Sequence, residues 1–472
     1  MLLLFIHGWS VTNTDTYGKL PRIISRNAHK YDLDIEIKNI WLGRYISFHD
    51  EVTMTDLIRA LQQALHDTVP EIFVDNVPFS CITHSTGGPV VREWVDRYFG
   101  NEKLNELPLQ HLIMLAPANH GSSLATLGKE RIGRIKSWFN GIEPGKRILD
   151  WLALGSEYQY RLAEQNIHYK NADNGYFPFV IIGQSIDEKY YDFLNSYLNE
   201  VGSDGVVRVA GANMNYSMLV LKENTEKNLS IFHRTEAMEL NHLEQSGIIE
   251  QPVNTPLCVV PKASHSGSKM GILKSPTYKN ADKKPVVEMI FKALKVNDKA
   301  SYQNLEEEME DLTTKTQSKD KHSKKHRYSN IVFSIWDDEG NAVKNFDLFL
   351  LYGNNFEPEK LPKGFFVDRQ RNTKSPNTII FYLDYDVLAK NPDAMMGIRV
   401  FARPEKGFSY YHPVEYRNEV NNFLQMLQPN ETLYVKIILH RYVDRNSFRF
   451  GSADNKAMSF KDEKHNGGTI EF

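Results

Sequence analysis

The feature that most restricts how this chain can fold is a serine in a short turn of small residues, the sequence THSTGG at residues 83–88. An apolar run, Phe79–Ile82, precedes the turn, and a helical pattern begins at Gly88. A sharp turn between a strand and a helix lifts a serine hydroxyl above the sheet and directs the helix N-terminus at developing negative charge. This context predicts Ser85 as a nucleophile, although Thr83 occupies a position where glycine is usual.

Apolar runs alternate with helical patterns through the first half of the chain. Continuous apolar runs are typical of strands that are buried on both faces of a parallel sheet. The expected strands are residues 2–6, 33–37, 79–83, 109–115, 179–182 and 206–209, and the expected helices are residues 53–69, 88–99 and 285–294. We therefore predict an α/β fold with a mostly parallel central sheet.

Residues 122–178 interrupt this alternation with helices and loops. Apolar side chains recur there, among them Trp138, Phe139 and Trp151. An insertion at this place in the sheet favours a helical cap above the site, and the alternative is a set of helices that only pack. With this cap included, the catalytic domain is expected to cover residues 1–295.

The rest of the chain has a different texture. Residues 296–329 are polar, first acidic and then basic, which predicts a charged linker. After Ile331, short β-branched and aromatic runs are separated by turn residues, which predicts an antiparallel all-β sandwich over residues 330–472. Its texture is similar to that of sandwiches that bind membranes or partner proteins.

A second loop is expected beside Ser85, because the sequence His7-Gly8-Trp9 follows the first strand. In this kind of site, one oxyanion donor is the backbone N–H after the nucleophile and the other comes from such a loop. We assign the oxyanion hole to the N–H groups of Trp9 and Thr86. The residues expected to line the pocket are His7, Gly8, His84 and Gly87.

The acid of a catalytic triad should follow the nucleophile in the chain. Asp204 lies in a glycine-containing turn, GSDG, just before a β-branched run. Aspartate in such a turn is usually a turn former. The order along the chain nevertheless favours Asp204 over Asp187 and Asp192 as the acid.

The base should come last, and three histidines stand in the right part of the chain. His265 lies in a loop of small residues, ASHSG, after the apolar run at residues 257–260. His233 follows a short apolar run, and His242 falls in a segment expected to be helical. The sequence favours His265, which would take the proton from Ser85 while Asp204 orients its ring.

Composition excludes several other classes of protein. The net charge of −3 gives no global basic field for nucleic acid. Two cysteines, Cys81 and Cys258, make no disulfide framework, and no metal-binding motif occurs, so neither a metal nor a cofactor is expected. Without a signal or spanning segment, synthesis in the cytoplasm is expected, and export by a route that needs no signal peptide stays open.

Several motifs together resemble bacterial lipase-like α/β-hydrolases, including lipase effectors of type VI secretion and lipases similar to GPI-inositol deacylases. They are HGW, THSTGG, LAPANHGS, GKRILDWLALGSEY, GSDGVVRV and SHSG, spread over roughly residues 1–295. The resemblance implies hydrolysis of lipid carboxylic esters, often in phospholipids, and it carries the triad onto Ser85, Asp204 and His265.

The sequence therefore predicts a serine esterase or lipase, with phospholipase A cleavage at a membrane surface as the leading hypothesis. An antibacterial secreted effector would also need an immunity or secretion partner, which the C-terminal domain could bind. Two alternatives remain open: a soluble carboxylesterase or thioesterase, and a scaffold without catalysis.

Overall fold

The first half of the chain folds around a parallel sheet of six strands. In this computed structural model the described residues are 1–7, 16–47, 49–126, 145–186, 200–233, 236–318, 326–391, 394–404, 409–417 and 423–444. The strand order is β2-β1-β3-β4-β5-β8, and every neighbouring pair is parallel. Its members are β1 (Leu2–His7), β2 (Glu36–Trp41), β3 (Phe79–His84), β4 (Leu109–Leu115), β5 (Phe177–Gly183) and β8 (Leu257–Val260).

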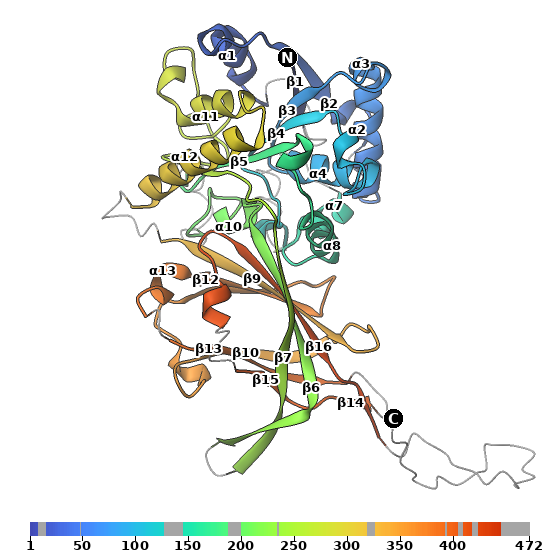
Figure 1. Cartoon of the computed structure of the whole chain (residues 1–472), viewed down its shortest axis with the longest axis vertical. Helices are drawn as coiled ribbons and strands as arrows, with labels where there is room; N and C mark the ends of the chain where they lie inside the picture. The colour runs from blue at the N-terminus through green and yellow to red at the C-terminus, as the bar shows by residue number, and fades with distance from the viewer. Residues whose placement is uncertain are drawn as a thin grey trace, which may run out of the picture.

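Helices cover both faces of this sheet, which confirms the predicted α/β fold. Figure 1 shows α1, α11 and α12 on one side and α2 with α4 on the other. Because both faces are covered, the central strands carry apolar residues at nearly every position. The helices are α1 (Leu20–Asn27), α2 (Met54–Thr68), α3 (Glu71–Val74), α4 (Gly87–Tyr98), α11 (Pro285–Leu294) and α12 (Lys299–Ser318).

The segment expected to be a charged linker is largely a helix, α12. Its sequence places Tyr302, Leu305 and Met309 on one buried face, a spacing that the run of charges between them hides. The Thr313 hydroxyl donates to the carbonyl of Leu257 and accepts from an N–H of the same edge strand, β8. The expectation of a linker is therefore wrong for residues 299–318, which protect a sheet edge.

Helices do fill the region between β4 and β5, as predicted. They are α5 (Ser123–Thr126), α7 (Lys146–Leu152) and α8 (Glu157–Asn166). The side chain of Trp151 is only 2% exposed and belongs to the core of the parallel sheet. Trp138 and Phe139 lie outside the described residues, so the role of this region as a cap stays a prediction.

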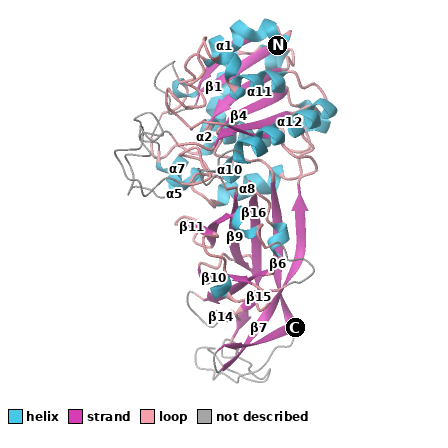
Figure 2. Ribbon diagram, turned by 90° about the vertical axis from the view of Figure 1, so that its left-hand side faces the viewer, coloured by secondary structure: helices cyan, strands magenta, loops and turns pink. Residues whose placement is uncertain are grey.

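The second half of the molecule is a curled sheet of nine strands, which lies below the first sheet in Figure 2. Its order is β10-β13-β15-β7-β6-β16-β9-β12-β11. The strands are β6 (Tyr216–His233), β7 (Glu236–Glu250), β9 (Tyr328–Asp337), β10 (Asn345–Tyr352), β11 (Phe366–Arg371), β12 (Thr378–Asp384), β13 (Met396–Arg403), β15 (Val414–Tyr416) and β16 (Thr432–Leu439). This sheet confirms the predicted C-terminal β domain.

Three details of that part differ from the expectation. The sheet is mixed, because β16 runs parallel to both β6 and β9, and β15 runs parallel to β7. Two of its strands, β6 and β7, come from the segment expected to belong to the catalytic domain. His242 therefore lies in a strand and not in a helix, because pairing with β6 and β15 fixes its backbone.

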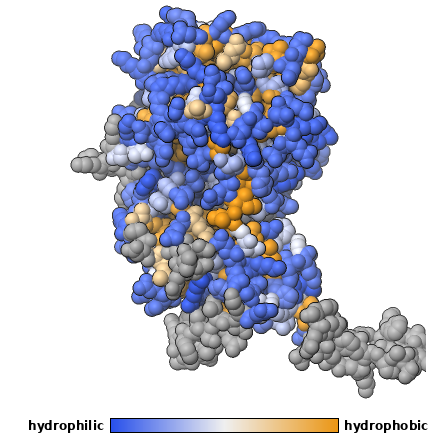
Figure 3. Space-filling view, in the orientation of Figure 1, coloured by the Kyte–Doolittle hydropathy of each residue, from blue (hydrophilic) through white to orange (hydrophobic). Residues whose placement is uncertain are grey.

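The two halves pack against each other through an apolar cluster that is separate from the cores of the two sheets. Its members come from the helical region between β4 and β5 and from the second sheet: Leu154, Ala163, Ile167, Tyr216, Met218, Val332, Ile380 and Tyr434. Figure 3 shows a mostly hydrophilic face with apolar side chains gathered near its middle. Among the described helices, none is long and apolar enough to cross a membrane.

Candidate active site

The turn between β3 and α4 has the backbone expected of a nucleophile elbow. Ser85 has a φ of +53°, a left-handed conformation that costs energy for any residue with a side chain. Its N–H donates to the carbonyl of Leu115 at 3.0 Å, and its carbonyl accepts from the N–H of Ala118 at 3.3 Å. Contacts with the strand β4 and the loop after it thus hold the strained turn in place.

The glycines after Ser85 permit close packing of strand and helix. A Cβ on Gly88 would lie 2.9 Å from the Cβ of Pro117, and one on Gly87 would lie 3.3 Å from the Cβ of Thr83. Thr83 is fully buried below the turn. A threonine can occupy the usual glycine position here because Gly87 leaves room for its side chain.

His265 and Asp204 meet Ser85 in a linear arrangement. The His265 Nε2 atom lies 3.1 Å from the Ser85 Oγ atom, and its Nδ1 atom lies 2.8 Å from Asp204 Oδ2. All three residues are buried, with the Asp204 side chain at 0% exposure. This is the geometry in which a histidine can take a proton from a serine while a carboxylate fixes its tautomer.

The loop around Asp204 is built to hold a carboxylate. Asp204 Oδ1 accepts hydrogen bonds from the N–H groups of Val206 at 3.0 Å and Val207 at 2.8 Å. The Asp204 carbonyl also accepts from the N–H of His265 at 3.0 Å, which ties the two loops together. The strand expected at residues 206–209 is instead this turn, followed by α10 (Val209–Ala212), because the backbone N–H groups serve the carboxylate.

The other residues expected to act as acid or base do not compete with this pair. Asp187 and Asp192 lie outside the described residues, and so does the side chain of His233. His242 lies in β7, within the nine-stranded sheet. Among the candidates in the described segments, only Asp204 and His265 are joined to Ser85.

The expected oxyanion hole is described in part. Thr86 follows Ser85 directly and is the N-terminal cap residue of α4, so its backbone lies at the positive end of that helix. Gly8 and Trp9 lie outside the described residues, so the second donor stays a prediction.

His7 and His84, both expected near the pocket, have different surroundings. The His7 ring stacks on Trp41, with 3.6 Å between the ring centroids, and its Nε2 atom lies 3.0 Å from Asn39 Oδ1. Burial lowers the pKa of His7 to about 4. The His84 ring lies 4.6 Å from the ring of His265 and its Nε2 contacts the His265 carbonyl at 3.3 Å. Burial, with the neighbouring His265, holds the pKa of His84 well below its usual range.

Comparison with solved structures finds a relative that matches nearly the whole chain. The phospholipase PlaB from Legionella pneumophila is 41% identical over 99% of this chain and 98% of that chain, with a TM-score of 0.85. Its structure in complex with thio-NAD gives 40% identity and a TM-score of 0.84. The chain belongs to the PlaB family. No protein-family model and no curated protein matches it.

Membership of the PlaB family confirms the predicted lipase-like α/β-hydrolase and the predicted class of enzyme, a carboxylic ester hydrolase. A Bacillus licheniformis lipase, BlEst2, is 19% identical over 44% of this chain and 78% of that chain, with a TM-score of 0.33. In the described part of this PlaB-family chain, no group of three or more His, Cys, Asp or Glu side chains could hold a metal ion.

The sequence did not reveal what holds the acid in place. The N–H groups of Val206 and Val207 are backbone groups in a run that reads as a strand. The one sequence signal was Arg208, a charged residue directly after that apolar run, whose side chain is 2% exposed.

Proposed function

We propose that this chain is a phospholipase A, which hydrolyses carboxylic esters of phospholipids through an acyl-enzyme at Ser85. The observation that carries the proposal is the continuous chain of contacts from Ser85 Oγ through His265 to Asp204, at 3.1 and 2.8 Å. The chain belongs to a family whose solved member is named a phospholipase, which supports a phospholipid as substrate.

In the proposed reaction, Ser85 Oγ attacks the ester carbonyl while His265 Nε2 takes its proton. The N–H groups of Thr86 and Trp9 would bind the oxyanion of the tetrahedral intermediate. His265 then gives the proton to the leaving alkoxide, which departs as the lysophospholipid. Water deprotonated by the same nitrogen hydrolyses the acyl-enzyme and releases the fatty acid.

The surroundings of Asp204 support its proposed role. Its carboxylate accepts two backbone N–H groups at one oxygen and faces the His265 Nδ1 atom with the other. An Nδ1–H directed at Asp204 leaves Nε2 as the acceptor for the Ser85 proton, and the carboxylate stabilises the imidazolium that follows. An acid held in this way needs little reorganisation during the reaction.

The enzyme is proposed to act at a membrane surface. If the protein is exported as an antibacterial effector, the C-terminal sheet is proposed to bind an immunity or secretion partner. Activity confined to short soluble esters would favour a soluble carboxylesterase or thioesterase. Failure to react with serine-directed probes would favour a scaffold.

The test combines covalent labelling with product analysis. A fluorophosphonate probe and phosphatidylcholine vesicles are given to wild type, Ser85→Ala and Ser80→Ala, with products identified by mass spectrometry. Ser80 is the matched control, because it also hydrogen-bonds a histidine, His111 Nδ1 at 2.7 Å, within the sheet. We expect Ser85→Ala not to be labelled and to have a kcat about 10⁶-fold lower than wild type. Ser80→Ala should be labelled and should release fatty acid and lysophospholipid. Labelling of Ser85→Ala would overturn the assignment.

A further inference from the structure

The loop that carries Asp204 is also the connection between the two sheets. Residues 200–208, here called the acid loop, lead directly into α10 and then into β6 of the nine-stranded sheet. Contacts made by the second sheet on the acid loop can therefore act on the proposed triad.

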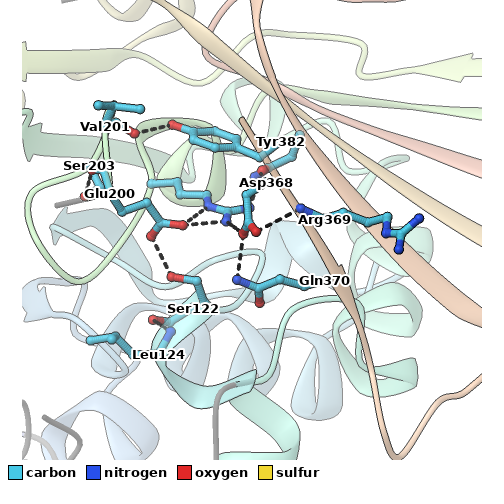
Figure 4. A network of polar contacts seen from close by, with 12 residues as sticks. Ser122, Leu124, Glu200, Val201, Ser203, Asp368, Arg369, Gln370 and Tyr382 are labelled. Atoms are coloured by element: carbon cyan, nitrogen blue, oxygen red, sulfur yellow. Dashed lines mark hydrogen bonds and ion pairs between the residues drawn. The ribbon is translucent and has the colours of Figure 1, made fainter. Parts of the chain in front are cut away.

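Arg208, at the end of the acid loop, joins the loop to that sheet. Its Nε donates to Glu200 Oε1 at 2.7 Å, at the other end of the same loop. Its Nη2 donates to Asp368 Oδ2 at 2.6 Å on β11, and its Nη1 to Asn330 Oδ1 at 3.3 Å on β9. Figure 4 shows Glu200 and Asp368 converging on the same guanidinium group. One buried cation thus closes the acid loop and fixes it to two strands.

Tyr382, on β12, completes this junction. The Arg208 guanidinium lies over its ring at 4.1 Å from the centroid, and the Tyr382 hydroxyl donates to the carbonyl of Val201 at 2.9 Å. Gly202 lies close to the rings of Tyr382 and Tyr328. A Cβ at this position would lie 2.3 Å from the Tyr382 hydroxyl and 2.2 Å from a ring carbon of Tyr328. The second sheet therefore touches the acid loop within two residues of Asp204.

We propose that Arg208, Asp368 and Tyr382 are positioning residues that hold Asp204 in register with His265, so that the C-terminal sheet is part of the catalytic apparatus. This inference rests on the proposed triad. The guanidinium is suited to the task because its planar fork can bind two carboxylates and stack on an aromatic ring at once. A lysine would keep the charge, but its three N–H donors sit on one nitrogen, so it could neither span the same separated acceptors nor stack on the ring.

The expected consequence is a loss of turnover and not of substrate binding. The acid loop contacts His265 and the second sheet, and orientation of the imidazole is needed only for proton transfer. A displacement of about 1 Å in a catalytic group can cost about 10²-fold in rate. Binding of the lipid would be little changed, so KM should stay near that of wild type.

The decisive comparison is Arg208→Lys against Arg399→Lys, in the full-length protein on phosphatidylcholine vesicles. Arg399 is the matched control because it is also buried in the nine-stranded sheet and paired with a carboxylate, Glu415 at 2.5 Å, away from the acid loop. Active sites are counted by end-point fluorophosphonate labelling, and kcat is expressed per labelled site. A merely structural role lowers the number of labelled sites but leaves kcat per site unchanged.

We expect Arg208→Lys to lower kcat per labelled site about 10²-fold with KM within about 2-fold of wild type, while Arg399→Lys keeps wild-type kcat. Equal kcat per site in the two variants would overturn the inference and leave the triad intact. If Ser85→Ala keeps its labelling, the triad itself fails, so the two failures are distinguishable.

A milder variant covers the case in which Arg208→Lys does not fold. Tyr382→Phe removes only the hydroxyl that donates to Val201 and keeps the ring beneath Arg208. We expect Tyr382→Phe to lower kcat per labelled site roughly 5-fold, which is less than for Arg208→Lys because only one contact with the acid loop is lost. Wild-type kcat per site in Tyr382→Phe, together with an unfolded Arg208→Lys, would also overturn the inference.

Discussion

In the six-stranded sheet every neighbouring pair of strands is parallel, whereas the nine-stranded sheet mixes parallel and antiparallel pairs. The first takes all its strands from residues 2–260. The second joins two separate segments, residues 216–250 and residues 328–439. The hairpin of β6 and β7 thus leaves the first half of the chain and enters the middle of the second sheet.

This difference shows that the two halves do not correspond to two continuous stretches of sequence. Between β5 and β6 the chain carries Asp204, completes the proposed triad and then enters the other sheet. A cut near residue 295 would remove β16, which is one of the two strands that pair with β6. Folding of the C-terminal sheet and order in the active site are therefore expected to depend on the same junction.

The largest expected effect on stability comes from placing a methyl group at that junction. Gly202 has a φ of +71°, and a Cβ there would meet the Tyr328 ring at 2.2 Å. Backbone strain and overpacking together predict that Gly202→Ala lowers the free energy of unfolding by about 4 kcal/mol. Urea denaturation of the full-length protein measures this loss.

Gly175 is the matched control, in the turn before β5 of the parallel sheet. Its φ of +74° is almost the same, but a Cβ there would meet nothing within 4 Å. Gly175→Ala should therefore cost only the backbone strain, about 1–2 kcal/mol. Equal losses in the two variants would show that the junction between the sheets is not tightly packed, and the contrast drawn above would fail.

The sequence predicts the parallel sheet well because its signals are local. Most of its strands are largely apolar runs, although β2 carries Glu36, Lys38 and Asn39. The turn at residues 83–88 is recognised from neighbouring residues alone. The order of the triad along the chain then leads to Asp204 and His265, which the structure brings together. These predictions use only short windows of sequence and the order of those windows along the chain.

The nine-stranded sheet could not be predicted in the same way. The pairing of β6 with β16 joins residues more than two hundred positions apart, and nothing in residues 216–250 indicates that partner. From sequence alone, the polar segment of β7 around His242 is predicted to be a helix, because the strands that pair with it are distant in the chain. The side chain of Arg208 likewise has one partner nearby in the chain, Glu200, but gains Asp368 and Asn330 only from distant strands.

A carboxyl group directly before β16, an interior strand of the second sheet, gives an intermediate effect on stability through pH. Burial, with the charge of Glu250, raises the pKa of Glu431 from 4.5 to about 7. Between pH 4.5 and 7 the unfolded chain loses this proton while the folded chain keeps it, so wild-type stability falls as pH rises through that window. Above pH 7 both states are ionised and the loss is complete.

Glu431→Gln removes this titration. We expect the variant to gain stability relative to wild type from pH 4.5 to 7, reaching about 2 kcal/mol after allowance for partial exposure of the group. Urea denaturation at several pH values measures the gain, with Glu359→Gln on the exposed surface as control. A difference from wild type that is constant with pH would mean that Glu431 is solvated, and that the end of the sheet where β16 begins is open to water.

The smallest expected effect concerns Thr83 and Gly87, which lie within the parallel half. A Cβ on Gly87 would come 3.3 Å from the Cβ of Thr83, so a threonine below the turn requires a glycine above it. Gly87→Ala should be destabilising in wild type and harmless in Thr83→Gly, with a coupling energy of about 1 kcal/mol in a double-mutant cycle.

Because the contact between Thr83 and Gly87 is local, the coupling energy should be the same whether or not the junction carries Gly202→Ala. Additive effects of the two substitutions would mean that the turn adjusts to its side chains, and that the left-handed backbone of Ser85 does not depend on this packing.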